Sequence, residues 1–158
     1  MVTGDDVRDF PQSETRAPLH RVALDYVVFF GSPFAAPDAE EIERNVRFML
    51  DSLRDLSTKA GVSHFAPHAY FPQFLRDEIE EERWLGIGGG AVHLKRSDEV
   101  VMRLPPWRGD LSRGMVAERD LAVRCKKATT LIHTEHEWAA YLYHLRQRVL
   151  SVGQIDLR

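Results

Sequence analysis

The sequence contains very little cysteine and no long hydrophobic stretch. Cys125 is the one cysteine among 158 residues, so no disulfide can form within the chain and a reducing compartment is expected. The most apolar run, Tyr26 to Phe30, is far shorter than the roughly 20 residues that a membrane-spanning helix needs. We therefore expect a cytoplasmic protein that does not associate with membranes.

An excess of one charge is also missing. The chain has 21 Lys and Arg residues against 24 Asp and Glu, which gives a formal net charge of −3. Nucleic-acid-binding domains usually carry a strongly basic surface, so nucleic acid is not an expected partner. With 44% hydrophobic and 28% charged residues, the composition is that of a globular domain, and small molecules are the expected partners.

The length and the distribution of polar residues predict one domain behind a short arm. Residues 1–18 are polar and contain two prolines, which is typical of a flexible N-terminal arm. Docking of this segment through Phe10 is an equally good interpretation. Residues 19–158 are expected to form a single domain of ordinary size.

Buried strand-like segments alternate with amphipathic segments along that domain. Strands are expected at 22–30, 62–66, 99–104 and 128–133, and helices at 38–60, 115–127 and 135–149, with an acidic helix from 76 that breaks at 88–90 and resumes at 91–95. The three glycines of the break either permit a close backbone approach or mark a mobile segment. This alternation predicts an α/β fold, a doubly wound, mainly parallel sheet of four to five strands in the Rossmann or flavodoxin manner, with helices on both faces.

Ligands bind such sheets at the carboxyl ends of the strands, where the strand order reverses. The loops expected there contain Gly31, Ser32, Pro33 and Phe34, then Pro67, His68 and Tyr70, and finally Ser112, Arg113, Gly114 and Met115. The last loop opens a helix, whose free N–H groups and dipole favour an anion such as phosphate. On spacing alone, a simple helix cap at Ser112 and a turn glycine at Gly114 are the more common explanation.

Glu118 follows in the same helix, about one turn past Ser112. A carboxylate at this place can attack a sugar C1′, or stabilise it as it becomes oxocarbenium-like. Complementing the helix dipole is the alternative, and charge pattern alone favours that alternative. As a nucleophile Glu118 must be ionised, which the nearby helix N-terminus is expected to favour.

The order of these motifs resembles the nucleoside 2-deoxyribosyltransferase-like superfamily, in particular its small phage and bacterial branch. The resemblance covers roughly 26–132, and its most specific parts are Ser-x-Gly-Met-x-x-Glu at 112–118 and Pro-His at 67–68, beside Gly-Ser-Pro at 31–33 and a helix with Asn45. It implies cleavage of an N-glycosidic bond in a nucleoside or nucleoside 5′-monophosphate, by hydrolysis or deoxyribosyl transfer. It also implies that no metal or organic cofactor takes part, and that the protein is a homodimer or higher homo-oligomer.

The resemblance further implies roles for individual residues. Glu118 would act at C1′, and Asp98, just before the third strand, would bind or protonate the leaving base. A 5′-phosphate would be held by Gly31, Ser32, Ser112 and Gly114, to which we expect His68 and Arg113 to add positive charge. The other expected substrate-binding residues are Pro33, Phe34, Asn45, Tyr70 and Met115.

Two other classes of function stay open. A non-catalytic nucleotide-binding or sensing module would suit the glycine run and the bulky loop around Trp107, whereas a structural protein that only kept the fold would bind no nucleotide. Trp107 could stack on a base, but packing of the loop is the more common role for an aromatic residue beside two prolines.

A metal site is not expected. His64 and His68 have the spacing of a helical metal pair, but Pro67 between them should preclude a helix, and no third ligand is placed near His133 and His136. Trp138, Tyr141 and Tyr143 lie on more than one face of the last helix, so we expect this helix to pack against a second subunit.

Overall fold

The computed structural model describes residues 21–151 and 155–156, so the arm expected at 1–18 lies outside them. Four parallel strands form a sheet in the order β2-β1-β3-β4. They are β1 (Arg21–Gly31), β2 (Val62–Phe65), β3 (Glu99–Arg103) and β4 (Ala128–Ile132), and a short β5 (Ile155–Asp156) pairs antiparallel with the start of β1. This order confirms the predicted doubly wound parallel sheet, with its reversal between β1 and β3.

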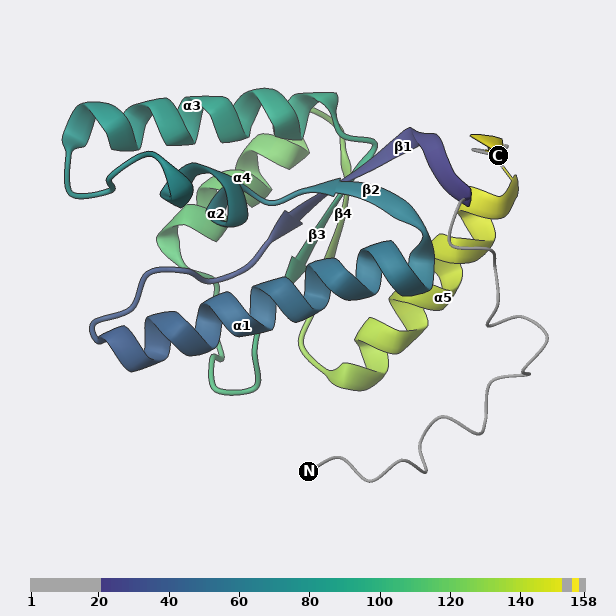
Figure 1. Ribbon diagram of the computed structural model, residues 1–158, viewed down its shortest axis with the longest axis horizontal. Helices are drawn as coiled ribbons and strands as arrows, with labels where there is room; N and C mark the ends of the chain where they lie inside the picture. The colour runs from purple at the N-terminus through teal and green to yellow at the C-terminus, as the bar shows by residue number, and fades with distance from the viewer. Residues whose placement is uncertain (1–20, 152–154, 157–158) are drawn as a thin grey trace.

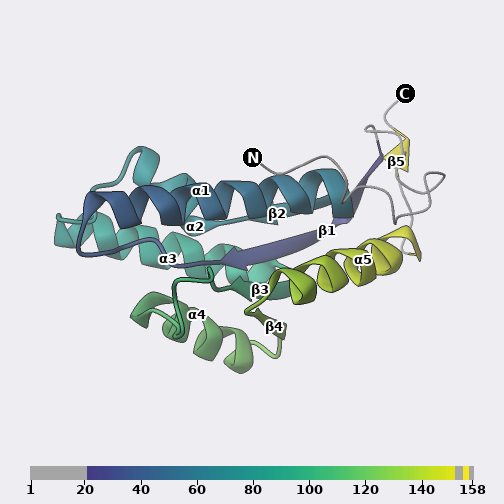
Figure 2. The same ribbon diagram turned by 90° about the horizontal axis from the view of Figure 1, so that it is seen from below.

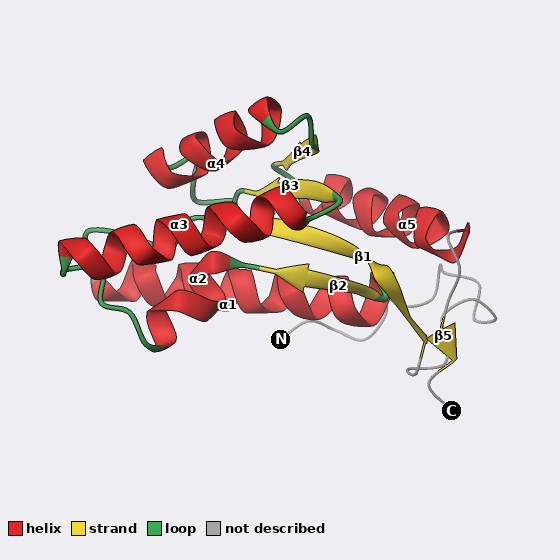
Figure 3. Ribbon diagram, turned by 90° about the horizontal axis from the view of Figure 1, so that it is seen from above, coloured by secondary structure: helices red, strands yellow, loops and turns green. Residues whose placement is uncertain are grey.

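Helices cover both faces of the sheet (Figure 1). One face carries α1 (Ala39–Asp55), its continuation as a π-helix (Leu56–Ala60), and α5 (Glu135–Ser151); the other carries α3 (Glu80–Arg96) and α4 (Arg113–Arg124). Figure 2 shows β1 between α1 and α4. The short α2 (Pro67–Tyr70), with a 3-10 turn (Phe71–Gln73), follows the carboxyl end of β2 (Figure 3).

The two central strands, β1 and β3, are buried on both faces. Val28 and Phe30 belong to the core beneath α1 and α5, whereas Phe29 and Met102 belong to the core beneath α3 and α4. Full burial of each such side chain stabilises the fold by about 1.5–3 kcal/mol. Burial on alternating faces explains why the strand sequences are almost continuously apolar.

Local sequence signals set the ends of α1. The Asp38 carboxylate accepts a hydrogen bond from the Glu41 backbone N–H at 2.8 Å, which satisfies one free donor of the first turn. After the π-helical turn, Gly61 takes a left-handed conformation with φ 68° and ends the helix, as the sequence predicts.

The helix α3 runs unbroken through the glycine run, so the predicted break is wrong. A Cβ atom on Gly89 would lie 2.4 Å from Phe71 Cζ, and one on Gly90 would lie 3.4 Å from Pro67 Cγ. The glycines therefore allow α3 to approach α2 and the turn after it closely. Packing of this kind overrides the low helix propensity of glycine, which costs about 1 kcal/mol per residue.

A buried carboxylate fastens α5 to the amino end of the sheet. Glu99 accepts hydrogen bonds from the Tyr26 and Tyr141 hydroxyls, and Arg148 Nη2 donates to it at 2.8 Å. Burial is the main cause that raises the pKa of both tyrosines, to about 12 for Tyr26, so they remain protonated donors. Tyr141 and Trp138 lie in the core and are not available for the subunit contact predicted for them.

Candidate functional site

The carboxyl ends of β1 and β3 lie side by side at the reversal of strand order. Gly31 at the end of β1 pairs with Met102 of β3, and the chain continues from them into α1 and α4 on opposite faces. The helix α4 begins at Ser112, whose Oγ accepts a hydrogen bond from the Met115 backbone N–H at 3.3 Å. Ser112 is therefore a helix cap, as spacing alone favoured.

Glu118 extends from α4 to the end of β1. It lies on the inward side of the helix, between Met115 and Ala122, which are both fully buried. A Cβ atom on Gly31 would lie 3.0 Å from Glu118 Oε2 and 3.3 Å from Met102 Cγ. Glycine at position 31 thus lets the carboxyl group lie directly against the backbone of β1.

Two buried polar atoms at this end of the sheet have no hydrogen-bond partner among the described residues, namely Glu118 Oε2 and Ser32 Oγ. Buried polar atoms usually have a partner, and exceptions occur at functional sites. Burial raises the pKa of the Glu118 carboxyl to about 8, so this group is protonated at neutral pH. Desolvation thus opposes ionisation, which contradicts the expectation that Glu118 is ionised.

The loops after β1 and β2 meet through stacked rings. The Phe34 and His68 rings are nearly parallel, with centroids 5.2 Å apart. Burial lowers the pKa of His68, and Asp77 opposes this only in part. The imidazole is therefore neutral near pH 7, which contradicts its expected positive charge. His68 does lie in a helix, since Pro67 occupies the first turn of α2, where proline is tolerated.

Asn45 joins the loops after β1 and β3. Its fully buried side chain donates to the Phe34 carbonyl oxygen at 3.2 Å and accepts from Trp107 Nε1 at 3.1 Å. Phe48 contacts the Trp107 ring edge-on, and Arg44 lies over that ring at 5.5 Å. Trp107 thus packs its own loop, and Asn45 positions two loops of the site.

The other residues predicted for substrate binding are distributed around this centre. Pro33 is buried, whereas Arg113 and Gly114 are exposed on the first turn of α4. Tyr70 is 52% exposed and makes edge contacts with the aromatic residues around it. Met115 is fully buried in the core beneath α4, so the structure places its side chain in packing rather than at the surface of a site.

Asp98 lies at the opposite end of the sheet. Its Oδ2 accepts a hydrogen bond from the Val27 backbone N–H at 2.6 Å, and its own N–H donates to the Val27 carbonyl at 2.8 Å. The strand β3 then advances about 13 Å before it reaches Met102, beside Gly31. The structure does not bring Asp98 to Glu118 within one chain, because Asp98 precedes the strand whereas the site lies beyond its carboxyl end.

Sequence reasoning missed a buried arginine at the end of β3. The Arg103 guanidinium lies between the Phe48 and Trp138 rings, with Cζ 4.5 Å and 4.6 Å from their centroids. It donates to Ser52 Oγ at 2.7 Å and also to Glu135. The sequence did offer a signal, because Arg103 is a charged residue at the end of a largely apolar strand. Through these bonds to Ser52 of α1 and Glu135 of α5, Arg103 holds both helices against the sheet.

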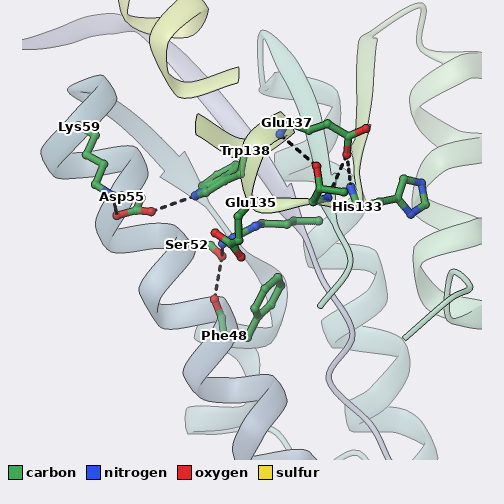
Figure 4. Close-up of polar contacts among 10 residues, drawn as sticks. Phe48, Ser52, Asp55, Lys59, His133, Glu135, Glu137 and Trp138 are labelled. Carbon is green, nitrogen blue, oxygen red and sulfur yellow. Dashed lines mark hydrogen bonds and ion pairs between the residues drawn. The ribbon is translucent and has the colours of Figure 1, made fainter. Parts of the chain in front are cut away.

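Further polar contacts lie at the end of α1, between α1 and α5, and at the start of α5 (Figure 4). Trp138 Nε1 donates to Asp55 at 2.9 Å, and Asp55 also pairs with Lys59 at 2.9 Å. Glu137 accepts the His133 backbone N–H at 2.8 Å, and such backbone hydrogen bonds lower the pKa of its carboxyl. These contacts fix the start of α5 after β4.

Neither a metal cluster nor a membrane-spanning helix is found in the part of the chain that the structure describes. No group of three or more His, Cys, Asp or Glu side chains there could hold a metal ion. His64 lies in β2 and bonds Ser57 at 2.8 Å. No helix within 21–151 is long and apolar enough to cross a bilayer.

Comparison of the sequence with known families gives a match. The sequence model of a family described as a domain of unknown function, DUF7768, matches residues 26–132. The chain belongs to the DUF7768 family. The DUF7768 match begins within β1, at residue 26, and ends at the last residue of β4, so it includes Gly31 and Glu118. No curated protein sequence matches the chain.

A solved structure shares the fold of this DUF7768 protein. It is described as a 2-deoxyribosyltransferase from the psychrotolerant bacterium Bacillus psychrosaccharolyticus. The superposition has a TM-score of 0.50 with 22% sequence identity, and covers 68% of this chain and 72% of that one. At this identity the likeness shows a related α/β fold.

Proposed function

We propose that this protein cleaves the N-glycosidic bond of a nucleoside or nucleoside 5′-monophosphate through Glu118. The observation that carries the proposal is Oε2 of the Glu118 carboxyl, which is buried against Gly31 at the reversal of strand order and has no partner among the described residues. The resemblance of residues 112–118 to the nucleoside 2-deoxyribosyltransferase-like superfamily supports this chemistry. The fold shared with a 2-deoxyribosyltransferase is consistent with it.

In the hydrolytic reaction, the bond between C1′ and the base nitrogen breaks and its electron pair leaves with the base. The ionised Glu118 carboxylate attacks C1′ or balances its positive charge. Water then supplies a hydroxyl group to C1′ and a proton to the base. Because burial raises the pKa of Glu118 to about 8, its proton must first leave to solvent. In deoxyribosyl transfer, a second base takes the place of water.

A phosphate at the other end of the sugar would hold C1′ against Glu118. The Ser32 hydroxyl is buried without a partner among the described residues, and Arg113 and Gly114 are exposed on the first turn of α4. Free N–H groups of a first helical turn favour an anion. Binding energy from such a remote group positions the reacting atom. We therefore include nucleoside 5′-monophosphates among the proposed substrates.

Chromatography of free base tests the proposal. The full chain is incubated with a panel of nucleosides and nucleoside 5′-monophosphates, beside Glu118→Gln and a control, Glu40→Gln. Glu40 is exposed in the first turn of α1, so this control removes a solvent-exposed carboxylate instead of a buried one. We expect release by the wild type and the control, and a loss of at least about 100-fold in Glu118→Gln. Equal release by all three proteins would contradict the proposal.

Nucleotide binding without cleavage is the second candidate function. A protonated carboxyl is a hydrogen-bond donor, so the raised pKa of Glu118 suits recognition of a neutral ligand. Calorimetry with the same panel separates the two candidates. Tight binding with no base released favours a nucleotide-binding module.

A further inference from the structure

The outer side of α3 presents large apolar side chains to solvent. Trp84 is 63% exposed, Leu85 66%, Ile87 51% and Val92 47%. Figure 1 shows α3 along one edge of the molecule, and its glycine-lined inner side packs on α2. Clustered exposed apolar groups of this kind mark interaction surfaces.

Gly88 lies in the middle of this outer side. Each end of α3, Glu80 and Arg96, is eight residues away from it. A Cβ atom on Gly88 would have no atom within 4 Å, so packing within the described chain does not require glycine there. Trp84 and Val92 lie four residues before and after Gly88 and share its side of the helix. The glycine therefore leaves a hollow between two exposed apolar side chains.

The two ends of α3 carry opposite charges. Its first turn holds Glu80, Glu81 and Glu82, and its last turn holds His93, Lys95 and Arg96. Glu81 and Lys95 lie seven residues before and after Gly88, which is two helical turns, so they share its side of the helix. Both are exposed, and no ion pair involves either of them within the described residues. A symmetric contact at Gly88 would bring these opposite charges together.

We propose that two copies of this chain associate through α3, packed antiparallel with a two-fold axis at Gly88. This register places Trp84 against Val92 of the partner subunit and Glu81 against Lys95 of the partner subunit, each twice by symmetry. The dipoles of the two helices are then antiparallel, which is a favourable arrangement. Glycine at the crossing lets the two backbones approach closely. Charge complementarity along the helix thus selects a second copy of this chain as the occupant, independently of what Glu118 does.

Charge reversal tests the register by sedimentation equilibrium of the full chain. Glu81→Lys faces Lys95 of the partner subunit with a like charge, and Lys95→Glu does the same for Glu81. We expect each single change to raise the dimer dissociation constant about tenfold. The double variant should restore the wild-type value. Both side chains are exposed, so circular dichroism should show an unchanged fold.

A bulky residue at the crossing gives a second test that does not depend on charge. Gly88→Arg should make the chain monomeric. Gly109→Arg is the matched control, since a Cβ atom at Gly109 also meets no atom within 4 Å, and this variant should remain dimeric. Both substitutions introduce a side chain into open space, so neither should disturb the fold.

Cysteine cross-linking tests the symmetry axis. In a Cys125→Ser background, Gly88→Cys should form an intersubunit disulfide on oxidation because the two copies of residue 88 face each other. Val92→Cys should not, since it faces residue 84. A wild-type chain that stays monomeric up to about 1 mM would overturn the proposal. A dimer that tolerates both the charge reversals and Gly88→Arg would overturn it equally.

Discussion

Glu118 is kept in its neutral form by burial alone. No hydrogen bond or neighbouring charge compensates its Oε2 within the described residues, and desolvation is the cause that raises its pKa to about 8. Ionising a buried carboxyl without a partner is costly. A group of this kind destabilises the folded chain at neutral pH, as functional groups often do.

Replacing Glu118 should therefore stabilise the protein in a pH-dependent way. The pKa of this carboxyl is higher in the folded chain, about 8, than its ordinary value of 4.5. Between these values the folded state binds more protons, so the free energy of unfolding falls as pH rises, by about 1.4 kcal/mol per pH unit. Glu118→Gln removes this dependence. Urea unfolding should show equal stability near pH 4 and a gain of about 4 kcal/mol in the variant at pH 8.

The exposed Glu40 supplies the control for this measurement. Glu40→Gln should change the free energy of unfolding by less than about 0.5 kcal/mol at either pH. If wild type and Glu118→Gln kept the same difference in stability at both pH values, the raised pKa of Glu118 would be refuted.

The contact at Gly31 gives a second prediction for single residues. Gly31→Ala adds a Cβ atom 3.0 Å from Glu118 Oε2, so the carboxyl must move by a few tenths of an ångström. We expect kcat/KM for base release to fall about 10- to 100-fold because a small displacement of a reacting group is costly. The free energy of unfolding should fall by no more than about 1.5 kcal/mol. Unchanged kcat/KM would show that the position of this carboxyl does not limit the reaction.

Among the elements, α3 shows how tertiary packing overrides the helix propensity of single residues. Gly88 and Gly89 are neighbours in one helix, yet a Cβ atom has open space at Gly88 and would lie 2.4 Å from Phe71 Cζ at Gly89. Helix propensity alone would favour alanine at both positions. The close approach of α3 to Phe71 requires glycine at the second.

The two alanine variants should therefore change stability in opposite directions. Gly89→Ala should destabilise the protein by about 1–3 kcal/mol because Phe71 must move, whereas Gly88→Ala should stabilise it by up to about 1 kcal/mol. Thermal unfolding at low protein concentration measures both in the monomer. Equal effects of the two substitutions would mean that Phe71 does not pack against α3 as the structure has it.

The loops after β1 and β3 are held in place by side chains of the neighbouring helix and strand. Asn45 in α1 bonds both Phe34 and Trp107, and so connects the loops after β1 and β3. Arg103 ties the end of β3 to α1 and α5. The site is thus built on the rigid sheet, with α1 as a common support for two of its loops.

For the whole molecule, the alternation of apolar strands and capped helices was enough to predict a doubly wound parallel sheet, but not the order of its strands. The same topology predicts that the loops after β1 and β3 converge, and Gly31 does lie against Glu118. The pKa of Glu118 could not be predicted from its place in α4, because it depends on burial by other elements. Asp98 precedes β3, so it lies at the amino end of this strand, whereas the site lies at the carboxyl ends of the parallel strands.

The rate of base release as a function of pH, for wild type and Glu118→Gln, tests the role of Glu118 most directly. Since kcat/KM reports ionisation of the free enzyme and the pKa of Glu118 is about 8, wild-type kcat/KM should rise about 50-fold from pH 6 to pH 8. Glu118→Gln should be at least about 100-fold slower than the wild type at pH 8, without this rise with pH. Release that survives Glu118→Gln, or no release from any nucleoside or nucleoside 5′-monophosphate, would contradict N-glycosidic cleavage by this residue.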